Sequence, residues 1–278
     1  MPELPEVQTM VSDLNKKILN RKITGFWSDT PRIFRYTTIE KISKEIPEFK
    51  ITEITRRAKY ILIHLKRKKE NKLLAIHPKL TGHLLIKNAK EKENPKSYIR
   101  AKFFLDKNLV LSFSDLRKFG KIMFGNKEEI ENLPDLKNLG PEPIGLNPKI
   151  FTQIISKKKK AIKQVLLDPE TISGIGNIYS DEALWMSKIH PFRAANTLTN
   201  TEFKKLHKSI KEVLIKSIAL RGSSIRNYRD TEGKEGGYKA VRKVYSREGL
   251  PCYRCKTPIT RVKMGVRSAR FCPTCQKI

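Results

Sequence analysis

The apolar residues near the start of the chain recur at the spacing of one helical face. They are Val7, Met10, Val11, Leu14, Ile18 and Leu19. Positions three and four apart lie on one side of an α-helix. A proline such as Pro5 suits the first turn, because its missing N–H would have no partner there. The chain is therefore predicted to open with an amphipathic helix over residues 5–19.

After this helix come short runs rich in β-branched and aromatic residues, a composition typical of strands. The runs span residues 51–65, 73–86, 98–105, 109–113 and 121–124. Asp106, Lys107 and Asn108 separate two of them and favour a hairpin turn. We predict an antiparallel β-sandwich domain over residues 1–132.

The rest of the chain is predicted to be mainly helical. Residues 133–148 are rich in proline and glycine, lack periodicity and are predicted to be a linker. Helical spacing returns in 157–167 and 177–188, and a capping box at Thr199 and Glu202 starts a third helix that ends at Gly222. We therefore expect a helical domain over 149–222, a flexible glycine-bearing loop over 223–243 and a last module over 244–278. The fold class is α+β.

The last module contains all four cysteines of the chain, Cys252, Cys255, Cys272 and Cys275. Two pairs, each with two intervening residues, match the spacing of a tetrathiolate zinc site. Two disulfides are the alternative, which a cytoplasmic location disfavours. Four sulfur ligands leave no open coordination position, so we predict one structural Zn²⁺ that holds a basic β-hairpin suited to phosphates.

The chain carries 58 lysine and arginine residues against 28 acidic ones, a formal net charge of +30. Such an excess predicts a polyanionic partner, although a lysine-rich composition without a binding role would also produce part of it. The apolar runs are too short to span a membrane. The acidic, proline-bearing start lacks the features of a secretory signal. We therefore expect a cytoplasmic protein that binds nucleic acid and no membrane.

Pro2 becomes the terminal residue if Met1 is removed, and a terminal proline is a secondary amine. Because an α-amino group has a pKa of about 8, a useful fraction is unprotonated at neutral pH. Its condensation with a sugar aldehyde gives a cationic iminium, which eases elimination of the 3′ phosphate. Glu3 and Glu6 follow, and one could move protons while the other caps the helix. A plain helix start is the alternative, and the N-terminal residues taken alone favour it.

Three separated motifs carry a family resemblance. They are the opening Met-Pro-Glu-Leu-Pro-Glu-Val, the run Gly-Ile-Gly-Asn-Ile-Tyr at 174–179, and the four-cysteine finger. With 57–60, 115–120 and 140–143, they make the chain resemble the bacterial family of formamidopyrimidine-DNA glycosylases and endonuclease VIII. The resemblance implies a helix-two-turn-helix second domain. It also implies a base-excision repair enzyme that flips out 8-oxoguanine or formamidopyrimidines, excises them and nicks the strand by β,δ-elimination.

The resemblance assigns roles to individual residues. Pro2 would attack C1′ and form the Schiff base, while Glu3 would be the acid that opens the sugar, with Glu6 in support. Lys59 would assist β-elimination, and Arg267 would grip phosphates and assist δ-elimination. Leu80, Arg117 and Phe119 match the side chains that fill the hole left by the flipped nucleotide. The other predicted DNA-binding residues are His77, Tyr98, Lys158, Lys163 and Asn177.

Some positions depart from the family pattern, and other functions stay open. Leu80 stands where many members have Met, and Ala58 stands where Gly usually precedes Lys59. An endonuclease VIII acting on oxidised pyrimidines, a non-catalytic binder of damaged DNA and a generic zinc-ribbon protein are the alternatives. Leu4 and the long loop favour the purine enzyme. We expect a monomer associated with the bacterial nucleoid, whose affinity for DNA falls steeply with salt.

Overall fold

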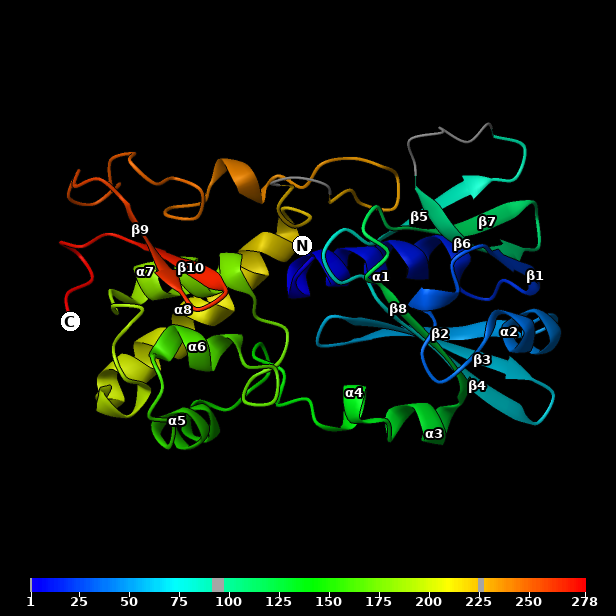
Figure 1. Ribbon diagram of the computed structural model, residues 1–278, viewed down its shortest axis with the longest axis horizontal. Coiled ribbons are helices and arrows are strands. Elements are labelled where there is room, and N and C mark those ends of the chain that lie inside the picture. The colour runs from blue at the N-terminus through cyan, green and yellow to red at the C-terminus, as the bar shows by residue number, and fades with distance from the viewer. Residues whose placement is uncertain (1, 92–97, 225–227) are drawn as a thin grey trace. The chain divides into compact units, whose positions relative to one another are not determined.

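The computed structural model describes residues 2–91, 98–224 and 228–278 (Figure 1). The chain divides into an N-terminal unit, Met1–Lys137 with Leu220–Gly237, and a C-terminal unit, Asn138–Ala219 with Tyr238–Ile278. The first boundary lies inside the segment predicted to be a linker. Met1 and residues 225–227 of the predicted flexible loop lie outside the described residues.

The N-terminal unit contains two antiparallel sheets of four strands each. One has the order β1 (Ile23–Ser28), β6 (Ile99–Leu105), β7 (Leu109–Ser114), β5 (His83–Asn88). The other has the order β2 (Lys50–Arg57), β3 (Tyr60–Arg67), β4 (Glu70–His77), β8 (Lys121–Asn126). The predicted antiparallel β-sandwich is confirmed.

The turn between β6 and β7 is also confirmed. Lys107 and Asn108 have φ values of 56° and 58°, the left-handed conformation that a tight hairpin turn requires and that asparagine tolerates. Strand β1 and the helices α2 (Ile39–Glu45), α3 (Lys127–Glu131) and α4 (Pro134–Lys137) were not predicted. The three helices have seven residues or fewer, which is too short for a clear apolar period.

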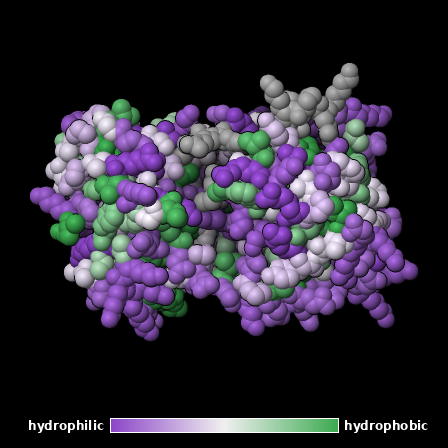
Figure 2. All heavy atoms as spheres, viewed as in Figure 1, coloured by the Kyte–Doolittle hydropathy of each residue, from purple (hydrophilic) through white to green (hydrophobic). Residues whose placement is uncertain are grey.

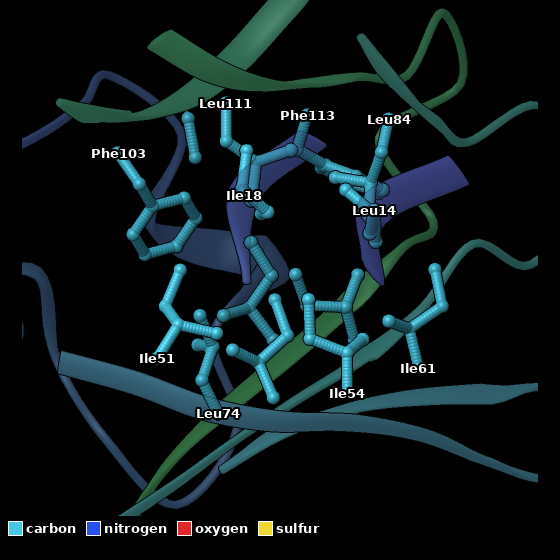
Figure 3. Packing of buried hydrophobic residues seen from close by; sticks show 14 of the residues in the cluster. Leu14, Ile18, Ile51, Ile54, Ile61, Leu74, Leu84, Phe103, Leu111 and Phe113 are labelled. Atoms are coloured by element: carbon cyan, nitrogen blue, oxygen red, sulfur yellow. The ribbon is translucent and has the colours of Figure 1, made fainter. Parts of the chain in front are cut away.

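Helix α1 (Leu4–Ile18) confirms the predicted amphipathic helix, and its apolar face packs against both sheets. Figure 3 shows Leu14 and Ile18 between Ile54 on one side and Phe113 on the other. Leu14, Ile18 and Phe113 have no exposed surface. The sheets therefore share one core through this helix, and the core fixes the position of its N-terminus.

The C-terminal unit consists of helices followed by a β-hairpin. The helices are α5 (Pro148–Ser156), α6 (Ile162–Leu167), α7 (Asn177–Ser187) and α8 (Asn200–Ala219), and the hairpin is β9 (Thr260–Met264) with β10 (Arg267–Phe271). The capping box is confirmed, since the backbone N–H of Thr199 donates to Glu202 Oε2 at 2.8 Å.

The helix predicted at 157–167 is only half right. Lys157 is the C-cap of α5, and residues 158–161 form a connection before α6 begins. Helix α5 was missed because Pro148 counted toward the linker, whereas it occupies the first turn. The side chain of Asn147 caps this helix by accepting the backbone N–H of Lys149 at 2.8 Å.

Hydrophilic residues cover most of the face seen in Figure 2, as the net charge of +30 leads one to expect. Within the described residues, none of the helices has the length and apolar character needed to cross a membrane.

Replacing Leu14 by alanine should lower the free energy of unfolding by about 2–5 kcal/mol, because it opens a cavity between the two sheets. Urea denaturation of the full chain measures the loss. The matched control is Lys16→Ala on the exposed side of the same helix, which should change stability little. Equal effects from both substitutions would mean that α1 is not the shared core element.

Candidate functional site

The N-terminus is held by a reciprocal capping box. The backbone N–H of Glu3 donates to Glu6 Oε2 at 2.7 Å, and the side chain of Glu3 accepts the backbone N–H of Glu6. Pro2, Glu3 and Glu6 are all buried. The helix-start interpretation is therefore right in geometry, and the same bonds orient the two residues to which the family resemblance assigns chemistry.

Glu6 also holds the start of the glycine-bearing loop. Its second oxygen, Oε1, accepts the backbone N–H of Ser223 at 2.7 Å. A Cβ atom on Gly222, which has a φ of 81°, would come within 2.8 Å of Glu6 Cγ. Only glycine allows this close approach. One carboxylate thus joins the N-terminal segment to the loop.

A second anchor is formed by Arg221, just before the loop, and involves residues 230 and 231 within it. Arg221 donates to Asp13 of α1 at 2.6 Å and to Asp230 at 2.7 Å. These two carboxylates raise the pKa of Arg221, so the guanidinium stays charged. Thr231 donates to the same Asp13 at 3.1 Å. Asp230 and Thr231 of the predicted flexible loop are therefore tied to α1 by charged hydrogen bonds, Asp230 through Arg221.

Lys59 lies in the turn that joins β2 to β3, where Arg57 pairs with Tyr60. Ala58, the first residue of this turn, has a φ of 52°. A left-handed alanine costs roughly 1 kcal/mol relative to glycine, so glycine would be the less strained residue at this position. The turn presents Lys59 at the end of the hairpin, where the resemblance places a catalytic lysine.

His77 lies within the electrostatic field of Lys59. Burial lowers the pKa of His77 well below its usual value, and Lys79, Lys59 and Lys121 add to the effect. His77 Nδ1 accepts the backbone N–H of Lys79 at 2.9 Å. The ring is therefore neutral at physiological pH and carries its proton on Nε2, as a hydrogen-bond donor.

Asp135 of α4 lies among these basic residues around His77. It was not identified from the sequence. It accepts a hydrogen bond from Tyr60 at 2.8 Å and a charged one from Lys121. The Tyr60 ring packs edge-on against His77, with centroids 4.6 Å apart. No sequence signal marked Asp135, because it lies in a stretch assigned to the linker.

The residues predicted to fill the gap that a flipped nucleotide leaves in the duplex lie on neighbouring loops of the N-terminal unit. Arg117 and Phe119 are exposed between β7 and β8, with the guanidinium carbon 4.6 Å from the ring centroid. Leu80 lies between β4 and β5, next to Thr81, whose hydroxyl accepts the backbone N–H of Arg117 at 3.1 Å. Tyr98, just before β6, is 44% exposed. The structure therefore brings the segments of Leu80, Arg117 and Phe119 together.

Two predicted DNA-binding residues of the C-terminal unit are exposed or partly exposed. Lys158 is exposed in the connection after α5, so its predicted place on a helix is wrong. Asn177 is the first residue of α7, and Gly176 is its N-cap. The Asn177 side chain stands beside the helix N-terminus, which favours anions.

Lys163 is placed differently from the expectation. Its side chain has no exposed surface, and Nζ donates to Asp181 Oδ1 at 2.5 Å and to the backbone oxygen of Ser268 at 2.6 Å. Burial raises the pKa of Asp181 to about 7, against the opposing effect of Lys163. The ammonium is committed inside the unit, so it does not face DNA. It supports β10 beside the exposed Arg267.

The four cysteines form one cluster, in which the sulfur atoms lie within 4.8 Å of one another. Backbone N–H groups of Arg254 and Cys275 donate to Cys252 and Cys272 sulfurs, each at 3.4 Å. Such bonds stabilise thiolates that bind a metal. The donor set and its geometry fit one tetrahedral Zn²⁺ with no open position, and the predicted structural zinc site is confirmed.

The finger is anchored to α7 by residues that sequence patterns did not reveal. Glu182 is buried, and its carboxylate accepts the backbone N–H groups of Lys243, Val244 and Tyr245 at 2.7 to 2.9 Å. Trp185 Nε1 donates to Cys252 Sγ at 3.5 Å. The metal site is thereby connected to the helical part of the unit.

Three family models together match most of the chain. Family models match the formamidopyrimidine-DNA glycosylase N-terminal domain at residues 1–122, the H2TH domain of these glycosylases at 139–229, and the zinc finger found in FPG and IleRS at 249–278. The class of protein is thus a zinc-finger DNA glycosylase. The chain belongs to the formamidopyrimidine-DNA glycosylase family.

Individual relatives agree over the full length. The formamidopyrimidine-DNA glycosylase of Pelotomaculum thermopropionicum is 38% identical over 100% of both chains. Lactococcus lactis Fpg in complex with DNA containing an abasic site has a TM-score of 0.91, 32% identity and 100% coverage of both chains. MutM in complex with DNA containing carbocyclic 8-oxo-G has a TM-score of 0.90 and 33% identity, also at 100% coverage of both.

Removing the metal should unfold the finger. We expect Cys275→Ser to abolish zinc binding and to weaken DNA binding, because the hairpin loses a contribution on the order of 10 kcal/mol from its structural ion. Metal analysis and thermal melting with and without chelator measure this. Thr274→Ala, next to the ligand, is the control. A Cys275→Ser chain that keeps tight DNA binding without zinc would contradict a structural role for the metal.

Lys163→Met should destabilise the chain by roughly 3–5 kcal/mol, because it leaves Asp181 buried without its partner, and Asp181→Leu in the same chain should recover much of the loss. Urea denaturation of the two variants measures the difference. Lys160→Met, in the exposed run nearby, is the control. If Lys163→Met leaves stability unchanged but flattens the salt dependence of DNA binding, Lys163 contacts phosphate after all.

Proposed function

We propose that this chain removes oxidised purines, such as 8-oxoguanine and formamidopyrimidines, from DNA and cuts the strand by β,δ-elimination, with the amine of Pro2 as nucleophile. The observation that carries the proposal is that Pro2 and Glu3 are both buried, and that the capping box at the start of α1 fixes Glu3, the residue directly after Pro2. A helix start needs no terminal proline, whereas an amine nucleophile needs a terminus that is held in place.

The chemistry follows from the groups present. After loss of Met1, the Pro2 nitrogen attacks C1′, the base leaves with the electron pair of the glycosidic bond, and the proton of the Pro2 nitrogen passes to the departing base. Glu3 gives its proton to the ring oxygen, so that the sugar opens to a cationic iminium. Loss of a C2′ proton then expels the 3′ phosphate, and a second elimination releases the 5′ phosphate. Water hydrolyses the remaining iminium and frees Pro2.

The other residues take supporting roles in this proposal. Lys59 assists the first elimination, and Arg267 on β10 neutralises the phosphate that leaves in the second. His77, Lys158 and Asn177 contact the DNA backbone. The complexes of related proteins with abasic and 8-oxo-G DNA support these substrates.

The side chains that we propose stabilise DNA with a flipped nucleotide all belong to the N-terminal unit. Leu80 and Phe119 fill the space it leaves, while Arg117 and Tyr98 contact the strands around it. Zn²⁺, when bound, supplies structural support to the finger and no chemistry at the sugar. We further propose that the chain acts as a monomer in the bacterial cytoplasm.

Borohydride should trap a covalent adduct on Pro2 when the protein meets duplex DNA carrying 8-oxoguanine opposite cytosine. Extra residues ahead of Pro2 turn its nitrogen into an amide, so trapping should fall by at least about 100-fold. The same residues added after Ile278 are the matched control. Gel electrophoresis and peptide mapping measure the adduct.

The outcomes separate the alternatives. Trapping on an abasic site but not on 8-oxoguanine would keep the lyase and reject the purine specificity. Preference for an oxidised pyrimidine in the same panel would favour an endonuclease VIII activity. Tight binding without trapping on any substrate would make the chain a binder of damaged DNA.

A further inference from the structure

Asp115 is a buried carboxylate that the proposed chemistry does not use. It lies just after β7 and has no exposed surface. Its Oδ1 accepts hydrogen bonds from the hydroxyl of Thr81 and from the backbone N–H of Arg117, the latter at 3.2 Å. Its Oδ2 accepts the backbone N–H of Gly120 at 2.7 Å. The carboxylate therefore closes the loop 115–120 and ties it to the loop after β4.

The backbone of the same residue connects a third segment. The N–H of Asp115 donates to the carbonyl oxygen of Tyr98 at 3.0 Å, and its own carbonyl oxygen accepts Arg100 Nε at 3.0 Å. Three segments that are distant in sequence, 78–82, 98–100 and 115–120, thus meet at one residue. Each of them carries a predicted DNA-binding residue.

The three segments need this support because each contains a strained residue. Lys79, Tyr98 and Lys118 have φ values of 53°, 50° and 56°. A left-handed conformation costs roughly 1–2 kcal/mol for a residue with a side chain, so it persists only where surrounding bonds impose it.

The space around the junction is also closed. A Cβ atom on Gly120 would lie 2.4 Å from the Phe113 ring, and one on Gly82 would lie 2.4 Å from the carbonyl oxygen of Pro78. The conformation of the loops is therefore fixed by dense packing against the interior and by the hydrogen bonds of Asp115 between them. Arg117 and Phe119 stay exposed on the outer side of the loops.

We propose that Asp115 is a positioning residue that holds Leu80, Tyr98, Arg117 and Phe119 in the arrangement needed to enter the duplex beside a flipped nucleotide. This inference rests on the proposed function. Asp115 has no access to DNA and acts only through the loops that it joins. A misplacement of about 1 Å at such a wedge is enough to slow the reaction by about 100-fold.

A carboxylate is required here rather than an amide of the same size. Asp115 receives three donors and gives none, and asparagine would turn an N–H₂ group toward at least one of those donors. Asp115→Asn therefore keeps the volume of the side chain but breaks part of the junction. The variant should retain the sandwich core while the wedge loses its fixed geometry.

The test compares two substrates with Asp115→Asn. Duplex DNA with 8-oxoguanine requires insertion of the wedge, whereas an abasic site in single-stranded DNA leaves no hole to fill. We expect the single-turnover rate on the duplex to fall by about 10- to 100-fold, with borohydride trapping on the single strand unchanged. Fluorescence of 2-aminopurine next to the lesion should report slower unstacking. Asp29→Asn, at an exposed aspartate of the same unit, is the control.

Several results would overturn the proposal. A parallel loss on both substrates would show that Asp115 maintains the whole site, and an unchanged duplex rate would show that its bonds are dispensable. If Asp115→Asn fails to fold, Thr81→Val decides, because it removes one donor to the junction and should slow the duplex reaction selectively. If the unaltered protein traps neither substrate, the proposed function fails instead, and the two failures are distinguishable.

Discussion

Glu6 lies on the first turn of α1 without exposed surface, and its two oxygens accept the backbone N–H groups of Glu3 and Ser223. A buried carboxylate is costly unless every oxygen is satisfied by donors. Because the donors come from the N-terminus and from the loop that starts at Gly222, neither segment can move without leaving a charge unpaired. The core between the sheets positions α1, and the hydrogen bonds of Glu6 hold the residues proposed to do chemistry in a fixed place relative to this helix.

The same use of carboxylates recurs across a chain that has few of them. The chain has 28 acidic residues against 58 basic ones. Several of these acids are buried, where they accept hydrogen bonds from backbone N–H groups or from a lysine side chain. Asp115 joins three loops, Glu182 holds the segment before the finger, and Asp181 binds Lys163. The basic residues left at the surface are then available to a polyanion. The burial of these acids therefore orders the interior and also leaves the excess of basic residues at the surface.

The sequence predicted those features that depend on local pattern. The periodic apolar face gave α1, the turn residues 106–108 gave a hairpin, and the cysteine spacing gave the metal site. Patterns did not reveal α2, because a helix of seven residues contains too few periods. They did not reveal β1 because Gly25 interrupts its short run of strand-forming residues. The candidate catalytic residues came from the family resemblance, because a capping box and a nucleophilic terminus look alike in sequence.

Lys158 and Lys163 show why the other site residues could not be predicted without the three-dimensional structure. Both are lysines in one basic stretch and both matched DNA-binding positions, yet one is exposed and the other is buried against Asp181. Nothing local distinguishes them, since the carboxylate that binds Lys163 and the carbonyl of Ser268 come from distant parts of the chain. A charge at the end of a long side chain is useful to a partner only if the fold leaves it unpaired. For Lys163 the fold pairs it with Asp181, and the neighbouring exposed charge is that of Arg267, next to the Ser268 that Lys163 supports.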